Sequence, residues 1–260
     1  MYGRSICKLG LTKLSASFCY FFCVFFLPST ITHADENPKL WTWTKDADHL
    51  LSVVRIDIDG AQATGVVAKL NENETKANGI ECYILTAYHV VEECKEEKAI
   101  QITYHTGDRI RECKIIAFDA QHDVALLKTW APKEVDAAIP ATDSVGDKMY
   151  VEFAGLGGSA ELDALRHFSS RATQPTNGQF IYADETLLPG DSGGPVFNRS
   201  KKLVGIISGG WFWWDAGIKS DAGVPILSTW PARASNLDVI QELLKKAEQK
   251  PISSEVLADN

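Results

Sequence analysis

The turn formed by residues 189–195 constrains the fold more than any other stretch of the chain. It reads Pro-Gly-Asp-Ser-Gly-Gly-Pro, so Ser192 lies among glycines. Glycine permits turns that other residues cannot make and lets a ligand approach the backbone closely. Successive N–H groups in such a turn can point at one spot and hold an anionic oxygen. Ser192 can therefore act as a nucleophile, provided that the fold supplies a base.

A serine in this kind of turn does not by itself identify one fold. The pattern G-x-S-x-G also fits the strand-to-helix elbow of α/β-hydrolases, in which the catalytic histidine follows the serine. The chain has six histidines, and the last of them, His167, precedes Ser192. The order of the residues therefore excludes the α/β-hydrolase arrangement.

A candidate base and a candidate carboxylate lie upstream of the serine. His89 follows an apolar, strand-like run that ends in small residues, and Asp123 directly precedes another apolar run. Histidine has a pKa near neutrality, which suits a group that must accept and then return a proton. The alternatives are His105, His122 and Asp119, which lack these surroundings. Because neighbouring strand side chains leave on opposite faces, we expect His122 to point away from Asp123.

These segments resemble the signature blocks of the trypsin/chymotrypsin superfamily, and the resemblance covers roughly residues 50–230. Residues 64–67, 188–190 and 203–207 are most similar to its HtrA-type branch. The resemblance implies an all-β fold, with two six-stranded antiparallel β-barrels of the chymotrypsin type and a C-terminal helix. HtrA-type proteins usually carry a C-terminal PDZ domain, and we expect none here because few residues follow Glu248.

The resemblance also implies a catalytic triad of Ser192 as nucleophile, His89 as general base and Asp123 as the carboxylate that orients the histidine. The N–H groups of Gly190 and Ser192 would form the oxyanion hole. Asp191 resembles the aspartate that pairs with a newly released amino terminus in zymogens. No Ile-Val-Gly-Gly-type terminus follows the N-terminal segment, so we expect Asp191 only to brace the turn.

Substrate binding is expected around two further segments. Thr186 holds the position six residues before the serine, which helps to shape the primary pocket in the family, and no acidic residue stands there. Ser208, Gly209 and Gly210 would form the substrate-binding strand, so we predict a preference for small or medium apolar residues before the scissile bond. The aromatic run 211–214 is either a half-packed hairpin or a contact platform beside the cleft.

Short strand-like segments with glycine-rich turns predict two β-rich halves. The resemblance implies that these are barrels at roughly 48–130 and 146–230 of one trypsin-like peptidase domain over residues 35–260. The polar stretch 71–79 is predicted to be a hairpin loop. Residues 236–248 are predicted to form a helix with a leucine-rich face, capped by Ser235 or Asn236.

Residues 1–34 have the pattern of a secretory signal peptide. Basic residues come first, an apolar stretch follows over 14–27, and small residues lie at positions 32 and 34. The apolar stretch is short for a membrane span, so we expect cleavage and no stable span afterwards; an uncleaved anchor is the alternative. The predicted location is secreted or periplasmic.

Charge and cysteine content limit the partners and cofactors. The net charge of −8 disfavours binding to nucleic acid, because the phosphates would be repelled. Outside the signal, Cys82, Cys94 and Cys113 allow one disulfide in any of three pairings. Their spacing lacks a Cys-x2-Cys pair, so we expect no metal site and no cofactor.

The sequence thus predicts an exported serine endopeptidase that acts on protein or peptide substrates through an acyl-enzyme. A catalytically silent binding or scaffold protein on the same fold is one alternative. An esterase on this fold is the other.

Overall fold

The computed structural model describes residues 47–76, 79–94, 100–146, 148–157, 165–173, 180–183, 187–210 and 232–249. The first half contains a 3-10 helix, a one-turn helix and seven strands: η1 (Asp48–Ser52), β1 (Val53–Ile58), β2 (Ala61–Lys76), β3 (Gly79–Thr86), α1 (Tyr88–Val91), β4 (Ile100–Thr103), β5 (Arg109–Ile110), β6 (Lys114–Asp119) and β7 (Val124–Ala131). The second half contains six strands and a helix: β8 (Tyr150–Gly155), β9 (Arg166–Thr173), β10 (Phe180–Ala183), β11 (Pro195–Asn198), β12 (Leu203–Gly210), β13 (Ala232–Asn236) and α3 (Leu237–Gln249).

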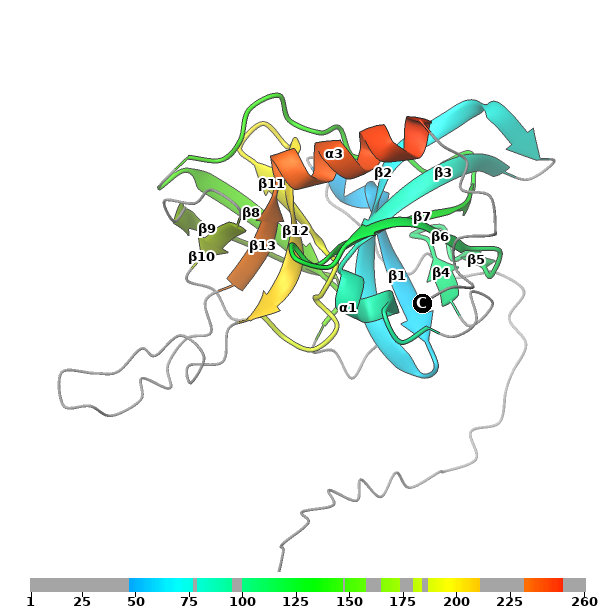
Figure 1. Ribbon diagram of the computed structural model, residues 1–260, viewed down its shortest axis with the longest axis horizontal. Coiled ribbons are helices and arrows are strands. Elements are labelled where there is room, and N and C mark those ends of the chain that lie inside the picture. Colours follow the sequence, from blue (N-terminus) through cyan, green and yellow to red (C-terminus); the bar gives the residue numbers. More distant parts are fainter. Residues whose placement is uncertain are drawn as a thin grey trace, which may run out of the picture. The chain divides into compact units, whose positions relative to one another are not determined.

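The strands form two antiparallel sheets (Figure 1). The first has the order β5-β4-β1-β2-β3-β7-β6, and the second is a closed barrel with the order β10-β13-β12-β11-β8-β9. The all-β class predicted from the sequence is confirmed, as is the C-terminal helix. The second barrel has the expected six strands. The first sheet has seven among the described residues, because the short β5 adds an edge strand next to β4.

The helix α3 joins the two halves. It packs on β6 and β7 of the first sheet and on β12 and β13 of the barrel, as Figure 1 shows. Its apolar face carries Ile240 and Leu243, which are buried in a core shared with Leu85 of the first sheet and Phe197 of the barrel. The Oδ1 atom of Asn236 accepts hydrogen bonds from the N–H groups at the start of the helix and so caps it.

The predicted loop at 71–79 is wrong. β2 continues to Lys76 and pairs with β3, with Asn71 opposite Glu81 and Thr75 opposite Ile80. The side chains of this extension are mostly exposed. Strand pairing there rests on backbone hydrogen bonds and needs no buried face, so the hydrophobic pattern gave no signal for it.

Cys82 is a buried free thiol whose Sγ lies 3.5 Å from Oη of Tyr104. Burial raises the pKa of this thiol to about 12, so it is protonated and unreactive at neutral pH. The two disulfide pairings that would use Cys82 are therefore absent.

The predicted signal at 1–34 lies outside the described residues, and none of the helices in the described part is long and apolar enough to cross a membrane.

Candidate active site

His89 lies at the end of strand β3, where the chain turns into the single helical turn α1. The apolar residues of β3 bury that strand between β2 and β7, and Ala87 starts the turn in an extended conformation. The His89 side chain is 44 % exposed. The buried strand β3 thus leads to the His89 ring, which is accessible to solvent and to a substrate.

Asp123 lies in the tight turn between β6 and β7 with a φ of 56°, in the left-handed region. Its Oδ1 accepts the backbone N–H of His89 at 2.8 Å, and its Oδ2 lies 2.8 Å from Nδ1 of the same residue. The carboxylate therefore holds His89 at two points. This contact fixes the proton on Nδ1 and leaves Nε2 as the acceptor.

The carboxylate of Asp123 is stabilised in its ionised form. Burial alone would raise its pKa, but the hydrogen bonds from His89 and Ser208 lower the pKa below the ordinary value. The Ser208 Oγ donates to Oδ2 at 2.6 Å, and Arg233 in turn donates to that hydroxyl at 2.8 Å. Sequence reasoning placed Ser208 only with the substrate and missed this contact, and no motif pointed to Arg233.

The Ser192 turn is hydrogen-bonded to β2, the strand that pairs with the histidine strand β3, and to β12. The N–H of Thr64 on β2 donates to the carbonyl of Ser192 at 2.9 Å, and Gly193 donates to Ile207 on β12 at 2.7 Å. A Cβ atom on Gly193 would lie 2.1 Å from both the Thr64 carbonyl and Oγ1 of Thr86. Since Thr86 is three residues before His89, only a glycine at 193 lets the serine turn sit against the histidine strand.

The backbone around Ser192 leaves two donors turned away from other protein groups. Within the described residues, neither the N–H of Gly190 nor that of Ser192 donates a hydrogen bond, whereas the N–H groups of Asp191, Gly193 and Gly194 all do. Gly190 adopts a φ of 101°, and its carbonyl accepts the Thr64 hydroxyl at 2.6 Å. Two neighbouring free donors of this kind can hold an oxyanion.

Asp191 is fully buried beneath the turn. Its oxygens accept the N–H of Gly157 at 2.9 Å and that of Leu188 at 2.8 Å, and the Arg166 guanidinium forms an ion pair with it. The cation that neutralises Asp191 is thus a side chain of strand β9. Sequence reasoning expected Asp191 to brace the turn but did not identify Arg166.

The alternative groups lie elsewhere. Asp119 accepts the backbone N–H of His122 at 3.0 Å and lies 2.8 Å from its Nδ1, a surface copy of the His89–Asp123 arrangement. Asp119 is thus paired with His122 and does not contact His89 in any bond of the described residues. His105 Nδ1 lies 3.0 Å from the Leu51 carbonyl.

The residues predicted to read the substrate are only partly described. Thr186 and the aromatic run 211–214 lie outside the described residues. Gly209 and Gly210 lie at the end of β12, paired with Arg233 and Ala232 of β13. Gly209 has a φ of 144°, and a Cβ atom there would meet nothing within 4 Å.

The chain is similar to known proteins. Residues 63–206 match the family model of the trypsin-like peptidase domain. The chain is 31 % identical over 138 residues to Protease Do-like 1, chloroplastic, from Arabidopsis thaliana; this covers 48 % of the chain and 30 % of that protein. It is 33 % identical over 131 residues to a probable periplasmic serine endoprotease DegP-like from Pseudomonas fulva, covering 48 % and 26 %. The chain thus spans under a third of these relatives.

Solved structures agree on the fold. The serine endoprotease from Yersinia pestis superposes with a TM-score of 0.55 at 16 % identity, over 79 % of this chain and 67 % of that one. An inactive serine-to-alanine mutant of a Mycobacterium tuberculosis protein also gives 0.55 at 17 % identity, over 86 % of this chain and all of the other.

Proposed function

Because this chain belongs to the trypsin-like peptidase family, and is HtrA-like within it, we propose that it is an exported serine endopeptidase. The observation that carries the proposal is the two-point contact between Asp123 and His89, together with a Ser192 turn that is bonded to β2 and β12 and in which Gly193 packs against Thr86 of the histidine strand. The names of the relatives support proteolysis of protein substrates. The word periplasmic in several of them supports a location outside the cytoplasm.

In the proposed reaction Ser192 Oγ attacks the scissile carbonyl carbon, and its proton passes to Nε2 of His89. Asp123 stabilises the resulting imidazolium. The carbonyl oxygen becomes an oxyanion held by the N–H groups of Gly190 and Ser192. Collapse breaks the C–N bond, and His89 protonates the leaving amine. Water then repeats the sequence on the acyl-enzyme and releases the second product.

The preorganised donors account for much of the expected rate. Removal of one oxyanion donor costs roughly 10²–10³ in turnover in well-studied serine proteases. Here the carbonyl of Gly190 is fixed by Thr64, and Thr64 Oγ1 also accepts the Leu156 N–H at 2.9 Å. One threonine of the first sheet thus holds the turn in the barrel that carries the proposed oxyanion donors.

A fluorophosphonate probe tests the proposal. It forms a bond only with an activated serine, so the folded protein should be labelled at Ser192, and Ser192→Ala should stay folded and lose the label. Absence of labelling in the folded protein would support the silent scaffold instead. Peptide and ester substrates then separate a peptidase from an esterase.

The substrate preference is proposed as small or medium apolar residues before the scissile bond, through Thr186, Ser208, Gly209 and Gly210. Digestion of an unbiased peptide library measures it, with Ser192→Ala as the control for contaminating proteases. Faster cleavage after Lys or Arg than after Val, Ala or Leu would contradict this preference.

A further inference from the structure

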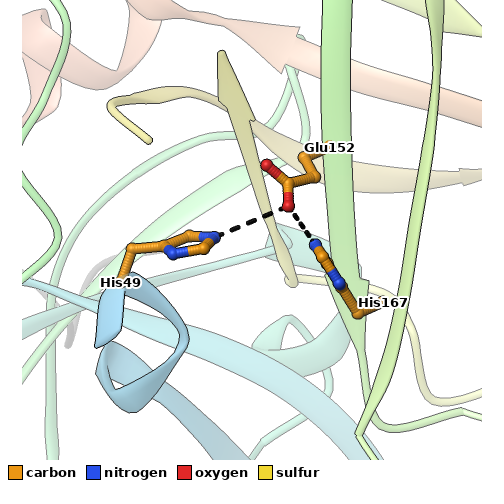
Figure 2. A group of neighbouring side chains, drawn as sticks. All are labelled: His49, Glu152 and His167. Carbon is orange, nitrogen blue, oxygen red and sulfur yellow. Dashed lines mark hydrogen bonds and ion pairs between the residues drawn. The ribbon is translucent and has the colours of Figure 1, made fainter. Parts of the chain in front are cut away.

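A second cluster of ionisable side chains lies apart from the proposed catalytic residues. It consists of His49 from η1, Glu152 from β8 and His167 from β9 (Figure 2). One ligand atom from each residue lies within 4.8 Å of the others. The register of β8 and β9 pairs Glu152 with Ser169, so His167 is its diagonal neighbour on the same face of the sheet. The cluster is therefore built into regular structure.

Glu152 is the centre of this cluster and is 1 % exposed. Its Oε1 contacts Nε2 of His167, and its Oε2 forms an ion pair with Nζ of Lys201. Nε2 of His49 lies 3.8 Å from Oε1. A carboxylate buried to this degree persists as an ion only when cations or metal ions neutralise it.

His49 is the member that ordinary packing does not explain. Its side chain is only 8 % exposed, yet Nε2 has no hydrogen-bond partner among the described residues. The ring packs edge-on against Phe197, with centroids 4.8 Å apart, which aims Nε2 at Glu152. Burial lowers the pKa of His49 below its ordinary value.

We propose that His49, Glu152 and His167 bind one zinc ion or a similar divalent transition metal. Two imidazole nitrogens and one carboxylate oxygen are a common zinc ligand set, and a fourth position remains for water. Ligand atoms about 2.0–2.2 Å from a tetrahedral zinc lie roughly 3.3 Å from each other. The 3.8 Å between His49 and Glu152 is close to that spacing, and His167 would move away from Glu152 to admit the ion.

The surroundings of the cluster would let a metal ion enter from solvent and bind stably. His167 is 38 % exposed, so its ring can rotate and open a path. Lys201 holds the second oxygen of Glu152 and orients the first one towards the two rings. This role matches the outer-shell partners that fix metal-bound carboxylates.

The metal would act as a structural clamp. It would tie η1, which leads into the first sheet, to β8 and β9 of the barrel. Arg166, the neighbour of His167 on β9, holds Asp191 beneath the Ser192 turn. Occupation of the site would therefore stabilise strand β9, which carries this brace.

Zinc titration of the metal-stripped protein tests the proposal, in a Ser192→Ala background so that self-digestion plays no part. Calorimetry should give one zinc per chain with a micromolar or tighter Kd. The melting temperature should rise by about 5–10 °C at a hundredfold excess over Kd. Cobalt in place of zinc should give the intense visible absorption of a four- or five-coordinate site.

Matched variants locate the ion. His49→Gln and His167→Gln keep a polar atom near the Nε2 position, and each should weaken zinc binding at least about 100-fold. His105→Asn alters a histidine outside the cluster and should leave binding unchanged. Loss of binding in the glutamine variants at unchanged secondary structure separates metal loss from misfolding.

Two outcomes would overturn the proposal. One is absence of zinc binding at millimolar concentration. The other is binding that survives both glutamine variants, which would place the ion elsewhere. All of these readings are independent of whether Ser192 is catalytic.

Discussion

Replacement of Arg166 by methionine should disable the Ser192 turn while leaving both sheets folded. Asp191 is 0 % exposed and has three partners, of which Arg166 is the only cation in the described part of the chain. Removal of one member of a buried ion pair costs about 3–5 kcal/mol. Because the Arg166 side chain is 28 % exposed, water can replace part of it, and the lower end, about 3 kcal/mol, applies.

This free-energy cost destabilises the active conformation of the Ser192 turn. Asp191 lies between Gly190 and Ser192, so a turn that moves its carboxylate towards water displaces both proposed oxyanion donors. At 1.36 kcal/mol for each factor of ten, 3 kcal/mol corresponds to a loss of up to about 100-fold in the rate of active-site labelling. The assay is the second-order rate constant for fluorophosphonate labelling, with urea unfolding measured on the same samples.

Two further variants make the interpretation specific. Arg166→Lys keeps a positive charge and should label within about fivefold of the native rate. The double variant Arg166→Met, Asp191→Asn removes the uncompensated charge and should recover part of the loss, which a double-mutant cycle measures. A folded Arg166→Met protein that labels at the native rate would refute the reasoning, because the turn would then need no internal cation.

Three other results are expected. Asp123→Asn should keep the fold and lower kcat by about 10⁴-fold, as in the well-studied triads, because the histidine is left in the wrong tautomer; kcat within tenfold of native would contradict this. Gly193→Ala should destabilise the protein by about 3 kcal/mol or more in urea unfolding, because its Cβ would lie 2.1 Å from the Thr64 carbonyl and Thr86 Oγ1; an unchanged midpoint would count against it. The lowered pKa of Asp123 stabilises the fold above the unfolded-state pKa of about 3.9, and this contribution is lost as pH falls through the folded-state value. Asp123→Asn should therefore lose less stability than the native protein between pH 7 and pH 3, and equal losses in the two proteins would exclude this linkage.

The sequence was most informative where a motif occupies consecutive residues. His89, Asp123 and the Ser192 turn each stand in a short run of characteristic residues, and the order of histidine and serine excluded one fold. The all-β class followed from the same runs. The structure brings Asp123 against His89 as these motifs imply.

Contacts between distant and ordinary residues could not be predicted. Arg166 lies 25 residues from Asp191 in a strand without a motif, and Ser208 lies 85 residues from the carboxylate that it bonds. Cysteine spacing gave no metal site, and His49, Glu152 and His167 form no motif because they lie far apart in the sequence. Only the strand register and the burial of the side chains place those three together.

The contacts of Thr64 and Asp123 join residues that are synthesised at different times. Thr64 belongs to β2, but it bonds to Leu156, Gly190 and Ser192, which are synthesised much later. The hydrogen bonds that support Asp123 come from Ser208, which Arg233 bonds in turn, and both residues are synthesised later still. A chain whose strands β12 and β13 are not yet made therefore lacks these supports of the proposed catalytic residues.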